Sequence, residues 1–247
     1  MTMKILSVLA VETSTSACSV ALIYNQKTYQ RYEILPQKHA QRLLVMVDEV
    51  LTEAGISGAD VDVLAYGEGP GAFTGVRIAA GVIQGLALGW DKPVFGISSL
   101  EAMAERVLSE TLLNDSQSRT EISWCALMDA RMKEVYIQSG TFSVEHNVWQ
   151  ASDPCLVSPE EAEERVNALA KDCIGLGDVE REYPALTKLF SQWFDTLPSA
   201  SAVAKLFQRM SEKGEIEYQT LALPVYLRND VADTIAERAK KRLAKEA

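Results

Sequence analysis

The chain has few of the residues from which metal sites and nucleophilic sites are usually built. Its 247 residues include only two histidines and four cysteines, and the cysteines stand singly, without a C-x-x-C pair. We therefore predict no metal centre. The sequence also lacks G-x-S-x-G and H-E-x-x-H motifs, which leaves a peptidase as the weakest of the alternatives considered. Isolated cysteines are typical of a reduced, cytoplasmic protein.

Excess positive charge and long hydrophobic runs are missing as well. The formal net charge is −10, which argues against stand-alone binding of nucleic acid, although another subunit could supply a basic surface. Apolar residues near the N-terminus are interrupted at Glu12, so they favour a strand over a targeting peptide. No run reads as a membrane span, and we predict no membrane association.

The pattern of strands and helices repeats along the chain. In the first half we predict strands at 5–11, 18–24, 27–34, 61–66 and 93–97, and helices at 39–54, 72–89 and 99–108. In the second half we predict strands at 122–128, 134–140, before Pro159 and at 172–175, with helices at 159–170 and 200–214.

This repetition predicts an α/β fold with two lobes, each a mixed β-sheet flanked by helices. The limits are 1–113 for the first lobe and 121–228 for the second, with a polar boundary at 114–120. A basic tail at 229–247 follows, interpreted as a solvated helix end, with contact to RNA or a partner as the less favoured alternative.

The motif from Gly69 to Arg77 joins a predicted strand to a predicted helix. Gly69 and Gly71 permit a tight turn, Thr74 could cap the helix, and Gly75 permits close approach of another backbone. Unpaired N–H groups at such a junction can bind an anion or contact a partner. The alternative is a plain turn followed by a helix cap.

The helix at 72–89 is apolar nearly all round, so it is either fully buried or shared with another molecule. The helix at 39–54 also has apolar residues beyond its main face. Burial within one lobe is the alternative to a partner surface. The residues predicted to form the partner interface are Leu43, Met46, Val47, Val50, Val76, Ala79, Ala80, Ile83 and Ala87.

Three motifs carry a resemblance to a known family: the hairpin at 11–22, the glycine motif at 69–77, and the Asp-Ala-Arg turn at 128–136 with the late segment 224–228. In these motifs the chain resembles the bacterial TsaB (YeaZ) family. The duplicated pattern is similar to the actin–Hsp70–sugar kinase superfamily, so the resemblance implies two actin-like lobes.

The resemblance also implies a function. Members of the family are non-catalytic subunits that bind and activate the catalytic subunit TsaD, to which they are related, and pair with it through their first two helices. With the ATPase TsaE, that complex forms N6-threonylcarbamoyladenosine at position 37 of tRNAs reading ANN codons. The family further implies a homodimer when the catalytic subunit is absent and only indirect contact with tRNA.

The residues themselves argue against catalysis by this chain alone. The two turns that would hold phosphates, at 12–15 and 129–133, contain no glycine. Ser99 and Met103 stand where catalytic relatives are expected to have a histidine pair, and both are poor metal ligands. The alternative is an active ATP-dependent transferase or kinase with Glu12 and Asp129 as metal-side carboxylates.

Weak binding of ATP or ADP with Mg²⁺ at an interface within the complex stays open. The residues predicted for a nucleotide or phosphate site are Glu12, Thr13, Ser14, Gly69, Gly71, Thr74 and Gly75.

Overall fold

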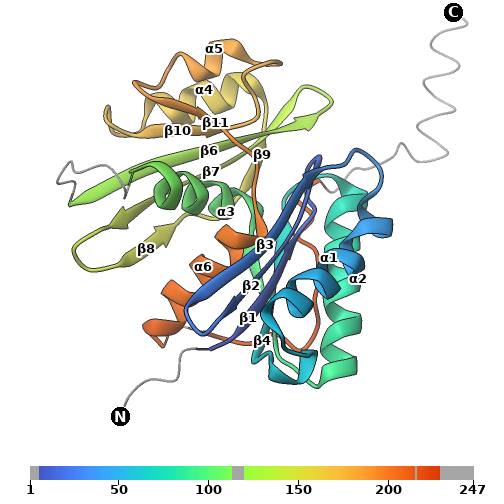
Figure 1. Cartoon of the computed structure of the whole chain (residues 1–247). Coiled ribbons are helices and arrows are strands. Elements are labelled where there is room, and N and C mark those ends of the chain that lie inside the picture. Colours follow the sequence, from blue (N-terminus) through green and yellow to red (C-terminus); the bar gives the residue numbers. More distant parts are fainter. Residues whose placement is uncertain (1–5, 113–119, 215, 229–247) are drawn as a thin grey trace, which may run out of the picture.

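The computed structural model describes residues 6–112, 120–214 and 216–228 (Figure 1). The predicted basic tail at 229–247 and nearly all of the predicted boundary at 114–120 lie outside these residues.

The first lobe is built on a five-stranded sheet. Its strands are β1 (Val8–Glu12), β2 (Ala17–Tyr24), β3 (Lys27–Ile34), β4 (Val63–Gly69) and β5 (Val94–Ser98), in the order β3-β2-β1-β4-β5. Strands β1, β2 and β3 form an antiparallel meander, whereas β4 pairs in parallel with both β1 and β5. The sheet is therefore mixed, and its parallel strands end at one common edge.

The second lobe repeats this topology. Its strands are β6 (Glu121–Arg131), β7 (Glu134–Ser143), β8 (Val148–Ala151), β10 (Ile174–Gly177) and β11 (Trp193–Asp195), in the order β11-β10-β6-β7-β8. A short strand β9 (Cys155–Val157) pairs with β7. The meander and the two parallel pairs recur in the same places. The predicted α/β fold with two mixed sheets is confirmed.

Helices α1 (His39–Ala54) and α2 (Phe73–Trp90) cover one face of the first sheet, while α6 (Ala200–Glu212) covers the other (Figure 1). In the second lobe, α4 (Pro159–Asn167) and the short α5 (Pro184–Thr187) pack on one face, and α3 (Ser99–Val107) packs on the other. Helical turns at Gly58–Asp60 and Leu108–Leu112 complete the elements.

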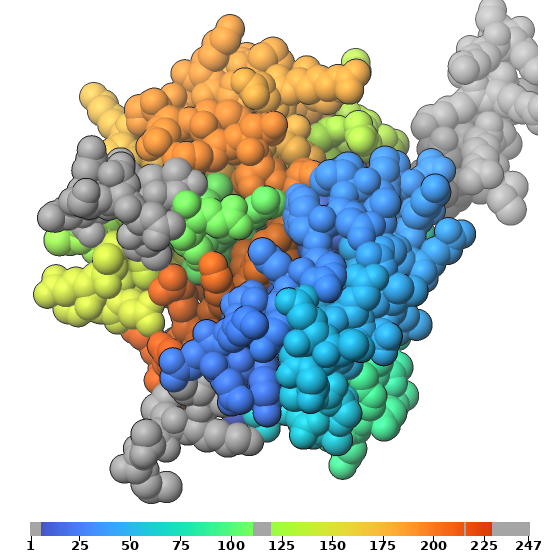
Figure 2. Space-filling view, in the orientation of Figure 1, coloured from blue at the N-terminus to red at the C-terminus, as the bar shows by residue number. Residues whose placement is uncertain are grey.

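The last helix of each half packs against the sheet of the other half. Helix α3 follows β5 but belongs to the core of the second sheet, and α6 follows β11 but belongs to the core of the first. In Figure 2 the orange-red segment that contains α6 is visible between the blue first lobe and the yellow-green part of the second. The predicted limits 1–113 and 121–228 thus follow the sheets but not the helices.

Residues 216–228, here called the C-terminal strap, return to the first lobe after α6. The Gln219 N–H donates to the Val94 carbonyl, and the Val225 N–H donates to the Glu68 carbonyl at 2.7 Å. The Tyr66 hydroxyl contacts both the N–H and the carbonyl of Leu223. The strap ends at Arg228, which forms an ion pair with Glu134 of the second lobe. It therefore connects both lobes.

Candidate functional site

The glycine motif forms the junction between β4 and α2. Strand β4 ends at Gly69, whose φ of +105° suits glycine, and a cis peptide bond precedes Pro70. Helix α2 begins at Phe73 with Ala72 as its N-cap and without a side-chain cap. The predicted capping role of Thr74 is therefore wrong: Thr74 lies exposed in the first helical turn.

The turn between β1 and β2 holds a fully buried acid. Glu12 Oε1 accepts a hydrogen bond from the Ser14 N–H at 2.5 Å, and Oε2 accepts one from the Ser99 hydroxyl at 2.8 Å. Burial raises the pKa of Glu12 above its usual value, although these hydrogen bonds oppose the rise. The carboxylate that the alternative of an active transferase or kinase would place beside a metal ion is thus held by the protein's own donors.

The glycine motif closes directly onto this turn. The Ala72 N–H donates to the Ser14 carbonyl at 2.7 Å, and the Thr13 hydroxyl donates to the Gly75 carbonyl at 2.8 Å. A Cβ atom at Gly75 would lie 2.0 Å from the Thr13 carbonyl oxygen, and one at Gly71 would lie 2.5 Å from that of Ser14.

The structure therefore brings together five of the seven residues predicted for a phosphate site, namely Glu12, Thr13, Ser14, Gly71 and Gly75. Gly69 lies beside the Val225 carbonyl of the strap instead, and Thr74 is exposed. The five residues form the contact between the β1–β2 turn and the start of α2. The close approach of another backbone expected at Gly75 is present, but that backbone belongs to the same chain.

Sequence reasoning missed the role of Gly67. A Cβ atom at this position would lie 1.7 Å from Glu12 Oε2. Only glycine at this point of β4 leaves room for the buried carboxylate. A lone glycine inside a strand signals a close approach of this kind, but its partner cannot be read from the sequence.

The second predicted phosphate turn lies between β6 and β7. Arg131, Met132 and Lys133 all have φ near +60°. The Asp129 carboxylate accepts the Arg131 backbone N–H at 2.8 Å and pairs with the Arg131 guanidinium at 2.9 Å. Local donors therefore use the acidic group that was considered as a metal ligand.

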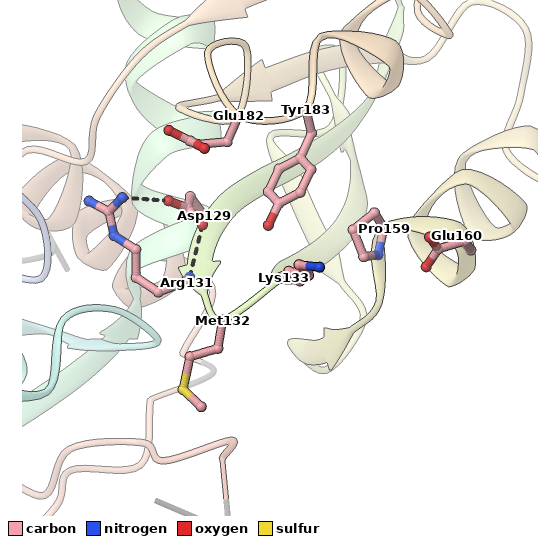
Figure 3. A pocket seen from close by; sticks show the side chains of 8 residues that line it. All are labelled: Asp129, Arg131, Met132, Lys133, Pro159, Glu160, Glu182 and Tyr183. Carbon is pink, nitrogen blue, oxygen red and sulfur yellow. Dashed lines mark hydrogen bonds and ion pairs between the residues drawn. The ribbon is translucent and has the colours of Figure 1, made fainter. Parts of the chain in front are cut away.

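A pocket of about 490 Å³ opens beside this turn (Figure 3). Its wall combines acidic and basic side chains: Asp129, Arg131, Met132, Lys133, Pro159, Glu160, Glu182 and Tyr183. The ring of Tyr183 points into the pocket between Asp129 and Lys133 (Figure 3). Behind the turn, burial raises the pKa of Asp178 to about 6.

Two glycines of β10 also serve packing. A Cβ atom at Gly175 would lie 2.4 Å from the Phe190 ring, and one at Gly177 would lie 1.7 Å from the Leu127 carbonyl oxygen. Gly177 has a φ of +139°. These positions join β10 to β6 and to the aromatic residues beside β11.

Possible metal ligands were sought among the described residues. Within residues 6–112, 120–214 and 216–228, no group of three His, Cys, Asp or Glu side chains is arranged to hold a metal ion. His39 is buried, with Nε2 3.2 Å from the Ala17 carbonyl oxygen. Ser99 and Met103 are fully buried.

The nine residues predicted as a partner interface are not on the surface. Each is buried, with at most 8% of its area exposed, and most of them lie in the core between α1, α2 and the first sheet. The prediction took the inward faces of the two helices for the outward ones.

The outward face of α2 is largely apolar, and α1 adds two exposed apolar side chains beside polar ones such as Gln41 and Asp48. Leu44 and Val45 on α1 are about half exposed, and Leu88 on α2 is 77% exposed. Gly81 and Gly85 lie between them in sequence, and a Cβ atom at either would meet open space. We call Leu44, Val45, Gly81, Gly85 and Leu88 the outer helical face.

Helix α2 is long and apolar enough, by length and composition, to cross a membrane, contrary to the expectation that no run would be. Its inner side packs on the sheet, with Val76, Ala79 and Ile83 in the core. Only 33% of its span is buried within the protein. The apolar outer side of α2 therefore does not pack on the sheet of the first lobe.

Comparison with known proteins defines the class first. A family model described as "TsaD: tRNA N6-adenosine threonylcarbamoyltransferase" matches residues 22–247. The chain is 36% identical over 230 residues to the tRNA threonylcarbamoyladenosine biosynthesis protein TsaB of Escherichia coli (strain K12), covering 91% of this chain and 96% of that protein.

A TsaB protein of Haemophilus influenzae is also 36% identical, over 239 residues, covering 93% of this chain and 96% of the relative. Among solved structures, YeaZ from Pseudomonas aeruginosa is 36% identical, with a TM-score of 0.73, covering 90% of this chain and 100% of that chain. The chain belongs to the TsaB (YeaZ) family.

Proposed function

We propose that this protein is a non-catalytic subunit that binds and activates a TsaD-like catalytic subunit in the synthesis of threonylcarbamoyladenosine on tRNA. The observation that carries the proposal is the unpaired apolar outer side of α2 in a chain of the TsaB family. A TsaE-like ATPase is the further protein partner, and contact with tRNA is indirect.

The turns support a role without catalysis. The β1–β2 turn contacts the glycine motif, the β6–β7 turn bonds its own Asp129, and Gly175 packs on an aromatic ring. Phosphate-binding turns work by directing free N–H groups towards the ligand. Here the chain's own atoms accept several of the hydrogen bonds that a nucleotide would need.

The outer helical face supports a protein partner. An apolar face of two helices exposed to water is typical of a surface that packs on another chain. Glycines at 81 and 85 allow another helix to approach the α2 backbone closely. The same face would form a homodimer when the catalytic subunit is absent.

Nucleotide binding belongs to the complex in this proposal. A weak site for ATP or ADP with Mg²⁺ lies at the interface with the catalytic subunit. Equilibrium binding of ATP to the isolated chain and to the complex tests it, with binding expected only in the complex.

The direct test of function is co-purification with a TsaD-like subunit, followed by a tRNA modification assay with and without this chain. We expect a stable complex and product formation that depends on this chain. Robust ATP hydrolysis or product formation by this chain alone would contradict the proposal and favour an active transferase or kinase.

The outer helical face makes a specific prediction. Gly85→Glu places a charge in the apolar face, so the affinity for the catalytic subunit should fall by at least about tenfold because an unpaired charge must be desolvated. The fold should tolerate the change because the site is open, and glutamate favours a helix over glycine by roughly 0.5 kcal/mol. Isothermal titration calorimetry measures the affinity.

The control is Asn167→Glu, at the exposed end of α4 in the second lobe. It adds the same charge away from the face and should leave the affinity unchanged. Equal affinities for both variants would show that docking uses another surface. Charged residues at Ala79 or Ile83 do not test the interface, because both side chains are fully buried.

A further inference from the structure

Arg77 on the first turns of α2 is held between two aromatic rings. Its guanidinium carbon lies 3.7 Å from the centre of the Phe73 ring and 5.4 Å from that of Tyr226. Its Nε donates to the Tyr226 hydroxyl at 2.6 Å. Phe73 and Tyr226 are 47% and 45% exposed. The guanidinium is thus fixed in one orientation while it faces solvent.

The hydrogen-bonding state of Arg77 sets it apart from most other arginines. In the part of the chain that the structure describes, the terminal amino groups of Arg77 contact no acceptor, and only Nε is bonded. By contrast, arginines that pair with a carboxylate stand at 31, 42, 106, 131, 165, 209 and 228. In this acidic chain the guanidinium of Arg77 is stacked on aromatic rings, while its terminal amino groups have no acceptor among the described residues.

Arg77 is also the one charged residue in the sequence of α2. It lies four residues before Gly81 and eight before Gly85, so these positions follow one ridge along the helix. The guanidinium therefore stands at one end of the outer helical face. Tyr226, which fixes it, comes from the C-terminal strap 149 residues away.

A protein that covers the outer helical face would remove Arg77 from water. Arginine stays protonated in proteins, and burying its charge without an acceptor is costly. The planar guanidinium matches the two oxygens of a carboxylate. Arg77 is the single charge on α2, which suits one carboxylate of a protein better than nucleic acid, where several cations are needed.

We propose that Phe73, Arg77 and Tyr226 form an anchor for an aspartate or glutamate carboxylate of the TsaD-like subunit that docks on the outer helical face. The anchor rests on the proposed function and adds that the docked partner supplies a carboxylate to Arg77. It also gives the C-terminal strap a part in binding, because the strap supplies Tyr226.

The test compares full-length wild type with Arg77→Gln, Arg77→Lys and Arg181→Gln by calorimetric titration with the purified TsaD-like subunit. Arg77→Gln removes the charge and should raise Kd by at least about tenfold, as expected for one member of a buried ion pair. Arg77→Lys keeps the charge without the planar group, so its Kd should lie between the two. Arg181 is exposed on the second lobe, and its variant should match wild type.

Thermal unfolding checks that the variants fold like wild type, and titration with tRNA tests a phosphate as the acceptor. Unchanged affinity in Arg77→Gln, while wild type binds, overturns the anchor alone. Wild-type affinity in Arg77→Lys overturns it too, because charge would then suffice. If Arg77→Gln weakens tRNA binding and leaves the affinity for the subunit unchanged, the acceptor is a phosphate of the tRNA, which overturns the carboxylate anchor. A wild type that does not bind the subunit overturns both the anchor and the proposed function.

Discussion

At the residue scale, the position of the Glu12 side chain depends on the absence of a side chain at Gly67. The Glu12 carboxylate occupies the space where a Cβ atom of residue 67 would lie. Glu12 also fixes the turn that contacts the start of α2, through the Ser14 N–H. The geometry of the α2 junction therefore depends on a glycine in the middle of β4.

This pairing predicts opposite effects for two glycine-to-alanine changes. Gly67→Ala should lower the free energy of unfolding by about 1–3 kcal/mol, because the new methyl group displaces a buried, hydrogen-bonded carboxylate. Gly81→Ala should raise it by up to about 1 kcal/mol, because the site is open and alanine favours the helix. Urea unfolding measures both. Equal changes would show that the packing at Gly67 does not limit stability.

Asp178 gives a prediction for pH. Desolvation, assisted by the charge of Asp129, raises its pKa to about 6. An unfolded aspartate titrates near 4. Between these values the folded state holds a proton that the unfolded state has lost, so this group's contribution to stability falls as pH rises.

Asp178→Asn removes this titration and keeps an oxygen that can accept the Asp129 N–H. At pH 8 the variant should be more stable than wild type by up to about 3 kcal/mol, from roughly two pH units at 1.4 kcal/mol each. The difference should shrink as the pH falls through 6 towards 4. Urea unfolding across this range measures it, and a difference independent of pH would contradict the assignment.

At the element scale, the sequence predicted where elements occur better than which way they face. Helix α1 has the predicted limits, and α2 and β5 begin one residue later than predicted, because apolar periodicity and Gly55 mark these ends. Helix α5 and β11 were missed, since elements of four and three residues are too short to show periodicity.

The face of α2 could not be predicted for a physical reason. The helix is apolar on nearly every side, so its sequence does not distinguish the side that packs on the sheet from the side that faces water. The glycine motif was recognised as a junction, but whether its partner is a ligand or the β1–β2 turn is a tertiary property. The stacking of Arg77 on Tyr226 is tertiary too, because the strap that supplies Tyr226 is distant in sequence.

Comparison of the two halves at this scale shows how a duplicated fold has diverged. Helix α5 occupies the place in the second half that α2 occupies in the first, because α5 connects β10 to β11 and α2 connects β4 to β5. It has four residues, whereas α2 has 18. Among the helices that the structure describes, only α2 in the first lobe is long and apolar in this way, so docking is proposed there.

At the scale of the whole molecule, the exchange of α3 and α6 ties the lobes into one structure. The Phe207 side chain of α6 is fully buried against the first sheet and meets Phe95 edge to face. Arg209, on the same helix, pairs with the buried Glu105 of α3. Each sheet therefore loses one of its covers if the other half of the chain is removed or unfolded.

This arrangement predicts that the described lobes unfold in one cooperative transition. Phe207→Ala should lower the free energy of unfolding by about 3–5 kcal/mol and shift the loss of helix and the loss of tryptophan burial together. Trp124 lies in one core of the second lobe and Trp193 lies against another, Trp90 lies against a core of the first lobe, and Trp149 packs against a core of each. Urea titrations followed by circular dichroism and by fluorescence test this. Two separate midpoints in the fluorescence titration, only one of them moved by the substitution, would show that the lobes unfold independently, because coupling between the lobes would carry the damage from one sheet to the other.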